Sequence, residues 1–173
     1  VSFELADYRE VEGEYDRIYS VGMFEHVGKK FYNVFFKSIN KLLKNDGLFL
    51  LHTIGVVDKP SPPNKFINKY IFPGGVCPSL SQIVKPIEKT GLIVADTETL
   101  IRHYDKTLLS WLNRFMAKKD LVKDMFDEKF VKMWSFYLAS CAAAFRYRDL
   151  AVFQLQIVKN FNAARPTRDY IYS

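Results

Sequence analysis

Cysteine, glycine-rich turns and long apolar runs are scarce in this sequence of 173 residues. Its only two cysteines, Cys77 and Cys141, lie far apart and match no metal-binding spacing, so we expect no metal site. So few thiols indicate a reducing compartment, and we expect a cytoplasmic location. No apolar run reaches the roughly 18–20 residues of a membrane span. No signal peptide is visible, although the chain does not begin with Met.

The sequence also lacks internal repeats, low-complexity tracts and a dominant run of charge. Lys and Arg number 25 against 19 Asp and Glu, which gives a net charge of +6. A basic balance suits anionic partners such as phospholipid headgroups or nucleic acid. The charges are dispersed in short clusters typical of solvated helix faces. Because only the net charge favours it, a nucleic-acid partner is not expected.

Apolar residues follow strand and helix periodicities in turn along the chain. Strands are predicted at residues 1–6, 15–21, 48–51, 91–100 and 151–158. Helices are predicted at residues 30–43, from residue 79 onward, and at 105–116 and 128–146. Turns or loops are predicted at residues 44–47, 57–65 and 68–75. This order indicates one α/β domain with a parallel sheet covered by helices.

The usual opening of such a domain is missing from the sequence. A doubly wound sheet normally starts with a strand that feeds a Gly-rich nucleotide-binding turn, and no such turn is present. The chain is therefore expected to lack the first part of its own fold. Unpaired strand edges would then be exposed. We expect another element or a partner subunit, for instance in a homodimer, to cover them.

An acidic residue, Glu25, follows the predicted strand 15–21 almost directly. Open α/β sheets bind their ligands at the carboxyl ends of strands, so this position favours a functional role. A plain strand-to-helix junction explains it as well, because a helix N-terminus stabilises negative charge. The pattern by itself leaves both interpretations open.

A histidine, His52, follows the continuous apolar strand 48–51. A structural histidine would fit this position. In a parallel sheet, however, Glu25 and His52 emerge at the same edge from adjacent strands. A carboxylate and an imidazole that converge there suit the binding of an anion or the handling of a proton.

Five segments carry a family likeness: DRIYSVGMFEHVG, DGLFLLHTIG, INKYIFPGG, HYDKTLLSW and FYLASCAAAFRYRDL. In order and spacing they resemble the cyclopropane-fatty-acyl-phospholipid synthases, over about residues 1–158. The mycolic acid cyclopropane synthases share a looser version. The resemblance implies a class I S-adenosylmethionine (SAM)-dependent methyltransferase fold, which is Rossmann-like. It also implies that the N-terminal part, including the Gly-rich SAM motif, is missing, so that residues 1–173 form the C-terminal part of a single catalytic domain.

The reaction that the resemblance implies adds a methylene group to an unsaturated lipid. The cis double bond of a phospholipid acyl chain attacks the SAM methyl group, the methyl loses a proton, and a cyclopropane ring closes. Bound bicarbonate is the implied proton acceptor. The family's bicarbonate-binding groups fall on Glu25, His52, the N–H of Ile54 and Tyr104. A cysteine of that set lies upstream in the family, and neither cysteine of this chain replaces it.

The resemblance also implies contacts with SAM from four residues of this chain. Asp7 and Tyr8 would flank the adenine, and Val21 and Gly22 would line the methionine end. With the Gly-rich motif absent, we expect this chain alone to bind SAM poorly and to be inactive.

The implied partner is a membrane lipid. We expect peripheral, salt-sensitive attachment to the inner face of the membrane. Phe24, Tyr70 and Phe72 are candidate walls for a cation, although core packing explains them equally well. Two rival functions remain: a SAM-dependent methyltransferase acting on another acceptor, and a non-catalytic lipid-binding fragment.

Overall fold

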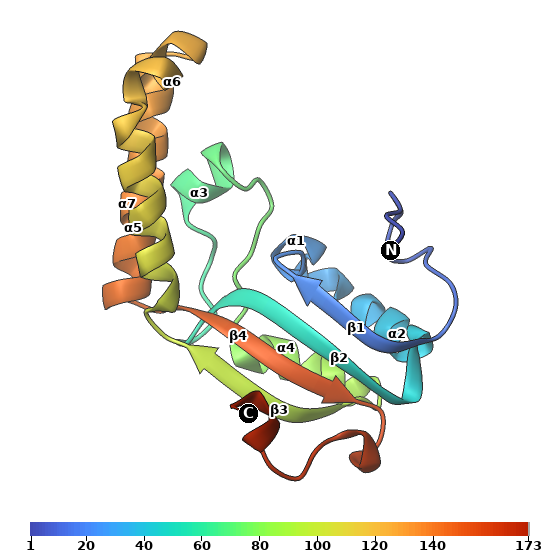
Figure 1. Ribbon diagram of the computed structural model, residues 1–173. Coiled ribbons are helices and arrows are strands. Elements are labelled where there is room, and N and C mark those ends of the chain that lie inside the picture. Colours follow the sequence, from blue (N-terminus) through green and yellow to red (C-terminus); the bar gives the residue numbers. More distant parts are fainter. Residues whose placement is uncertain (173) are drawn as a thin grey trace.

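The computed structural model describes residues 1–172; Ser173, the last residue of the predicted domain, lies outside the described part. Four strands form one sheet: β1 (Tyr15–Val21), β2 (Leu43–Val56), β3 (Ile93–Leu100) and β4 (Leu150–Val158). The sheet order is β1-β2-β4-β3 (Figure 1). Strands β1 and β2 are parallel, whereas β4 is antiparallel to both of its neighbours. The sheet is therefore mixed, and the expectation of an all-parallel sheet was wrong.

Seven α-helices accompany the sheet within residues 1–172. They are α1 (Phe24–Val27), α2 (Tyr32–Leu42), α3 (Lys65–Tyr70), α4 (Leu80–Lys89), α5 (His103–Ala117), α6 (Lys119–Met125) and α7 (Glu128–Tyr147). Short 3₁₀ turns occur at Lys29–Phe31, Phe161–Ala163 and Asp169–Ile171. The predicted helix start at Ser79 is confirmed, because Ser79 and Gln82 form a capping box at the start of α4.

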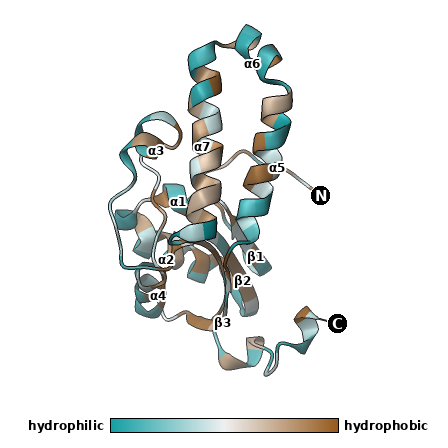
Figure 2. Ribbon diagram, turned by 90° about the vertical axis from the view of Figure 1, so that its left-hand side faces the viewer, coloured by the Kyte–Doolittle hydropathy of each residue, from teal (hydrophilic) through white to brown (hydrophobic). Residues whose placement is uncertain are grey.

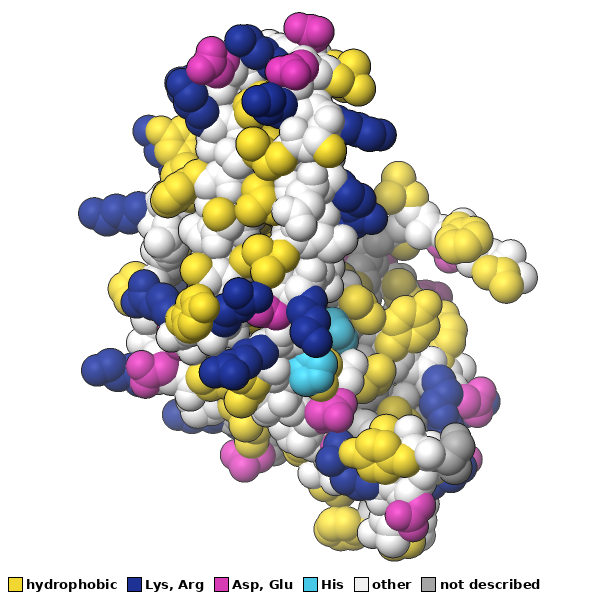
Figure 3. All heavy atoms as spheres, turned by 60° about the vertical axis from the view of Figure 1, so that its left-hand side comes forward, with side chains coloured by type: hydrophobic (Ala, Val, Ile, Leu, Met, Phe, Trp, Pro, Cys, Tyr) yellow, Lys and Arg dark blue, Asp and Glu magenta, His cyan; other side chains and the backbone are white. Residues whose placement is uncertain are grey.

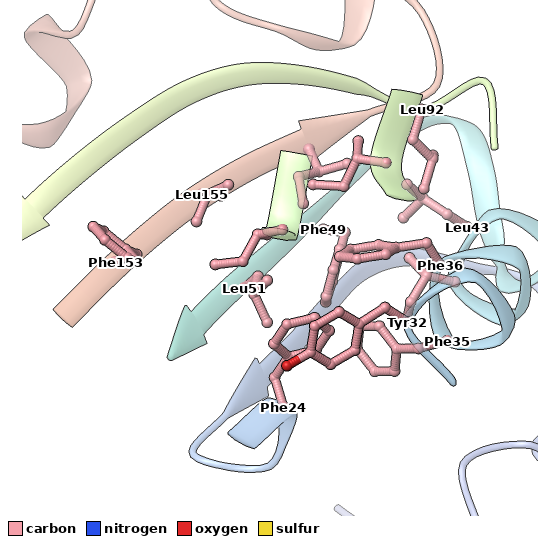
Figure 4. Packing of buried hydrophobic residues seen from close by; sticks show 14 residues of the cluster. Phe24, Tyr32, Phe35, Phe36, Leu43, Phe49, Leu51, Leu92, Phe153 and Leu155 are labelled. Carbon is pink, nitrogen blue, oxygen red and sulfur yellow. The ribbon is translucent and has the colours of Figure 1, made fainter. Parts of the chain in front are cut away.

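The main core lies between one face of the sheet and helices α2 and α4. Alternate residues of β2, Phe49 and Leu51, are completely buried there against Phe35 of α2 and Ile83 of α4 (Figure 4). Because side chains alternate along a strand, the intervening residues, His52 among them, point to the other face. The C-terminal tail reaches that other face, where the Tyr170 hydroxyl donates to Gln156 over 2.7 Å.

A long helical hairpin, called the arm below, extends away from the end of the sheet (Figure 1). It consists of the antiparallel helices α5 and α7, joined by α6 at the tip. Hydrophobic residues gather on the strands and along α5 and α7 (Figure 2). At the base of the arm, Leu108 and Leu138 pack against Val152 of β4. Arg146 also donates to buried Asp105 over 2.7 Å, which ties α7 to α5.

Several expectations about local structure were wrong. Residues 1–6 form no strand; they are exposed coil, because within the described chain no neighbouring strand pairs with them. Residues 44–47 belong to strand β2 and not to a turn before it; they form an irregularity at which the β1–β2 register shifts from the Tyr15–Leu43 pair to the Arg17–Leu48 pair. The short helices α3 and α6 were missed, since six or seven residues offer too little periodicity; α3 occupies residues that were predicted as part of a loop and of a turn.

Candidate functional site

Glu25 lies in the first turn of α1, just past the carboxyl end of β1, and is only 8% exposed. Its Oε1 accepts a 2.7 Å hydrogen bond from the N–H of Ile54 on β2. Its main-chain carbonyl accepts another, of 2.9 Å, from the N–H of Val76. The ends of two parallel strands and the loop before α4 therefore meet at Glu25. The positive φ of Gly22, 66°, allows the turn that leads from β1 into α1.

Three buried polar atoms close to this strand end have no hydrogen-bond partner among residues 1–172: Glu25 Oε2, the Tyr32 hydroxyl and Ser20 Oγ. Buried polar groups are normally paired, because leaving them unpaired is energetically unfavourable. Burial raises the pKa of Tyr32 to about 12, and the nearby charge of Glu25 adds to the effect. Donors and an acceptor are thus available here for a small polar ligand.

His52 is held by a row of side chains that crosses the sheet. Its Nδ1 lies 3.0 Å from Oε1 of Gln154 on β4, and Nε2 of Gln154 donates to Glu98 of β3 over 2.8 Å. With the amide oriented in this way, its oxygen can only accept, so Nδ1 of His52 carries the proton. Nε2 of His52 then keeps its lone pair and is available as a base or acceptor.

The expected partnership between Glu25 and His52 takes a different form. No hydrogen bond joins the two side chains within the described chain; Gln154, which the sequence analysis missed, orients the imidazole instead. The N–H of Ile54, expected to donate to a bound anion, donates to Glu25. The first difference arises because the β2–β4 register places Gln154 opposite His52. The second arises because the pairing of β1 with β2 ends at Val21 and His52, so the N–H of Ile54 lies beyond the end of β1 and meets Glu25 instead.

Tyr104 stands in the first turn of α5, at the base of the arm. Its ring packs against Phe145 of α7 and Trp111 of α5, with centroid distances of 5.1 and 6.0 Å. Burial raises the pKa of Tyr104, and the negative charge of Glu25 raises it further. Arg102, just before α5, has a left-handed φ of 64°, a strained conformation that often occurs at functional sites.

The four residues expected to contact SAM fall into two pairs. Val21 and Gly22 lie at the carboxyl end of β1, where the Gly22 N–H donates to the carbonyl of His52 over 3.2 Å. The other pair lies beside α2: the Tyr8 ring meets Phe35 edge-on at 5.4 Å, and Asp7 is paired with Arg9. Val21 and Gly22 are therefore the pair that adjoins Glu25 and His52.

A line of aromatic rings runs from the tip of the arm to this site. Successive ring centroids lie 4.4 to 6.1 Å apart along Phe126, Phe130, Trp134, Tyr137, Phe72 and His26. His26 is the neighbour of Glu25 in sequence. Phe72 was a candidate from the sequence, whereas the line itself was not predicted, although the i, i+4 spacing of the first three rings is visible in the sequence. Phe24 belongs to the core, where it stacks on Tyr32 at 4.3 Å.

The described residues contain neither a cluster of metal-binding side chains nor a membrane-spanning helix. No group of three or more His, Cys, Asp or Glu side chains in residues 1–172 is placed to hold a metal ion. None of the helices in that range is long and apolar enough to cross a membrane.

Known proteins share both sequence and fold with this chain. The family profile described as mycolic acid cyclopropane synthetase matches residues 1–155. The chain is 43% identical over 155 residues to cyclopropane-fatty-acyl-phospholipid synthase of Escherichia coli K12, covering 90% of this chain and 40% of that protein. It is 36% identical over 165 residues to tuberculostearic acid methyltransferase of Mycobacterium tuberculosis, covering 92% of this chain and 39% of that protein.

Among solved structures, that of a mycolic acid cyclopropane synthase complexed with SAH and CTAB aligns with a TM-score of 0.81 and 32% identity. The alignment covers 89% of this chain and 59% of that one. It confirms the predicted class I SAM-dependent methyltransferase fold. The chain spans about 40% of the length of the two curated relatives named above.

Proposed function

The chain belongs to the mycolic acid cyclopropane synthetase family, and from this membership we propose that it is part of a lipid-modifying enzyme. The enzyme transfers a methylene group from SAM to the cis double bond of an unsaturated phospholipid acyl chain. Residues 1–173 are the C-terminal part of its single catalytic domain. The observation that carries the proposal is the buried Glu25, whose Oε2 has no hydrogen-bond partner among residues 1–172.

The residues present fit a bound bicarbonate. Glu25 Oε2 is an acceptor for the hydroxyl group of the ion. The Tyr104 and Tyr32 hydroxyls are donors, and burial raises the pKa of both. When bound, bicarbonate supplies a base for the proton that the transferred methyl group loses. Glu25 would orient the ion, and Nε2 of His52 would receive the proton afterwards.

The residues present fit one end of SAM. Gly22 leaves open space at the end of β1, where a Cβ atom would meet no other atom of residues 1–172 within 4 Å. The main chain at Val21 and Gly22 is therefore accessible to the methionine end of the cofactor. When bound, SAM supplies the methyl group. The residues of this chain position the acceptor and keep water from the reacting carbons.

The aromatic line supports a long apolar acceptor. Its rings extend from Phe126 to His26, the residue that follows Glu25 in the sequence, and would give an acyl chain an aromatic path toward the site. Ring faces also stabilise the positive charge that develops on the acyl chain. We place the enzyme in the cytoplasm, attached peripherally to the inner face of the membrane.

The test uses the product of the complete reading frame that contains this chain. The protein is incubated with methyl-labelled SAM and vesicles of monounsaturated phospholipid, and the acyl chains are analysed by mass spectrometry and proton NMR. We expect chains heavier by one methylene unit, with cyclopropane ring protons. Glu25→Gln should abolish the product, whereas Glu10→Gln, at an exposed acid, should not.

Two other outcomes would overturn the proposal. A folded, SAM-binding protein that leaves the lipid unchanged but methylates a soluble compound is a methyltransferase with another acceptor. A folded protein that binds lipid vesicles without binding SAM is the non-catalytic lipid-binding alternative.

A further inference from the structure

Three rows of side chains cross the outer face of the sheet, which is the face opposite the main core. Each row takes one residue from β2, one from β4 and one from β3, because the strand register places the three opposite one another. From the arm outward, the rows are Ile54–Val152–Leu100, His52–Gln154–Glu98 and Leu50–Gln156–Asp96. The first row packs under the base of the arm. Figure 3 shows histidine side chains at the surface below the base of the arm, with an acidic side chain beside them.

The amide of Gln154 is the central link of the middle row. Its Oε1 lies 3.0 Å from Nδ1 of His52, and its Nε2 donates to Oε2 of Glu98 over 2.8 Å. A half-turn of the amide would exchange the oxygen and the NH₂ group at nearly the same positions. A neutral imidazole fits either orientation, because its proton can lie on either ring nitrogen. His52 by itself therefore does not select one of them.

Glu98 does select one orientation. An ionised carboxylate can only accept hydrogen bonds, so it requires the NH₂ group of Gln154 on its own side. The amide oxygen is then directed at His52, and Nδ1 of His52 must carry the proton. The direction of the whole row is therefore set at Glu98, on the far side of β4 from the imidazole.

The C-terminal tail, residues 159–172, holds Glu98 from outside. Nε of Arg168 lies 2.9 Å from Oδ2 of Asp96, and its Nη2 lies 3.9 Å from Oε1 of Glu98. Two carboxylates on one face of β3 repel each other, and the guanidinium beside both offsets this repulsion. The hydroxyl of Tyr170 anchors the same tail by donating to Gln156 in the third row.

We propose that Glu98 is a positioning residue for His52. Through Gln154 it keeps the imidazole proton on Nδ1 and leaves Nε2 free to act as a base, while Arg168 keeps Glu98 in place. The inference rests on the proposed function for the role of His52 as a base. The position of the proton on His52 can be measured without any reaction.

The first test locates that proton by NMR of the complete protein with ¹⁵N-labelled histidine. The ¹⁵N chemical shifts of an imidazole distinguish its two neutral forms, and the signals of His52 are identified by their loss in His52→Gln. The wild type should carry the proton on Nδ1. Glu98→Lys replaces an acceptor by a donor, so the amide should turn and the proton should move to Nε2. Glu98→Gln can donate or accept, so its shifts should be intermediate.

The second test measures product formation from SAM and monounsaturated phospholipid vesicles. Glu98→Lys should lower kcat roughly tenfold or more with unchanged KM values, because few molecules then have Nε2 free. Glu98→Gln should lower kcat about twofold, since both amide orientations are then similarly populated. The control Glu88→Lys makes the same change at an exposed acid on α4 and should alter neither the proton position nor kcat.

A charge swap separates positioning from a purely structural role. The double variant Glu98→Lys/Arg168→Glu restores an ion pair of inverted sign but keeps a donor at position 98. Its thermal melt should recover any stability that Glu98→Lys loses, whereas kcat should stay low and the proton should stay on Nε2. Recovery of kcat in the double variant overturns the proposal. So does a folded Glu98→Gln protein in which the proton of His52 stays entirely on Nδ1.

The two readouts also separate this inference from the proposed function. A proton that moves as expected, in a protein that forms no product, would leave the positioning role standing and refute the proposed function. Product from the wild type, with proton position and kcat both unchanged in Glu98→Lys, would do the reverse.

Discussion

The N–H of Ile54 donates a 2.7 Å hydrogen bond to Oε1 of Glu25, and this contact joins the ends of two parallel strands at a buried carboxylate. One oxygen of Glu25 is thereby fixed. The other, Oε2, is left without a partner among residues 1–172 and is available to a ligand. Fixing one oxygen of a carboxylate orients the second, which is what a site for a small protonated anion requires.

The hydrogen bond from His52 to Gln154 orients the imidazole, and breaking it is predicted to lower activity without lowering stability. Replacing Gln154 by Met removes the acceptor at Nδ1, so the proton can move to Nε2 and block the proposed base. We expect kcat of the complete enzyme to fall roughly tenfold or more, as loss of a positioning hydrogen bond implies, with an altered pH profile. Gln156→Met, two residues along β4, is the control. Unchanged kinetics of the Gln154 variant would show that His52 needs no such orientation.

The buried hydroxyl of Tyr32 predicts a stabilising substitution. Tyr32→Phe keeps the ring stack with Phe24 and removes a polar atom that has no hydrogen-bond partner among residues 1–172. The free energy of unfolding should rise by about 1 kcal/mol in the absence of ligand. Denaturant titration measures this change. A less stable variant would mean that the hydroxyl is hydrogen-bonded in solution.

Close packing around Gly55 predicts that adding a single methyl group at this position destabilises the folded protein. A Cβ atom at this position of β2 would overlap the Phe153 ring and the carbonyl oxygen of Pro78. Gly55→Ala should therefore lower the free energy of unfolding by about 1–3 kcal/mol. Thermal melting of the wild type and the variant measures this change. Equal Tm values would show that the loop at Pro78 shifts at little cost to make room for the added Cβ atom.

The ion pair at the base of the arm predicts a pH dependence of stability. Its hydrogen bond with Arg146 holds the pKa of Asp105 below the ordinary value of 3.8. A lowered pKa in the folded state gives stability that is present above the ordinary value and is lost as the pH falls through the lowered one. Asp105→Asn should thus lower the Tm at neutral pH, and the difference from the wild type should shrink below about pH 4.

The control for that experiment is Asp16→Asn, which removes an exposed pair with Lys44. Exposed pairs contribute little to stability, so the control should melt close to the wild type at every pH. A Tm difference between the wild type and Asp105→Asn that stays constant over the whole pH range would contradict the expected pH dependence.

Elements that depend on local pattern were predicted well. The strand at residues 15–21 has the predicted bounds, and the strand predicted at 151–158 begins one residue earlier, at Leu150. The capping residue Ser79 identified the start of α4. The long helices α5 and α7 were found within two residues at each end. Periodicity, caps and turn residues act over a few neighbouring positions, so the sequence displays them directly.

The candidate site was predicted only in part. The motif around Glu25 and the family likeness pointed to Glu25, His52, Ile54 and Tyr104, and the structure places these residues around the carboxyl ends of β1 and β2 and the base of the arm. The functional roles of these residues stay predictions. The partners that orient them were not visible, because no local pattern links Gln154 to His52.

The sequence alone determined the family, the helical and strand periods, the basic charge and the positions of the acidic and histidine residues at strand ends. Only the tertiary structure decided that β4 runs antiparallel, that residues 1–6 lie unpaired, that Gln154 holds His52, and that six aromatic rings align from the arm to the site. The reason is that strand register and direction are non-local. His52 and Gln154 are separated by 102 positions, and their contact exists only after the sheet has formed.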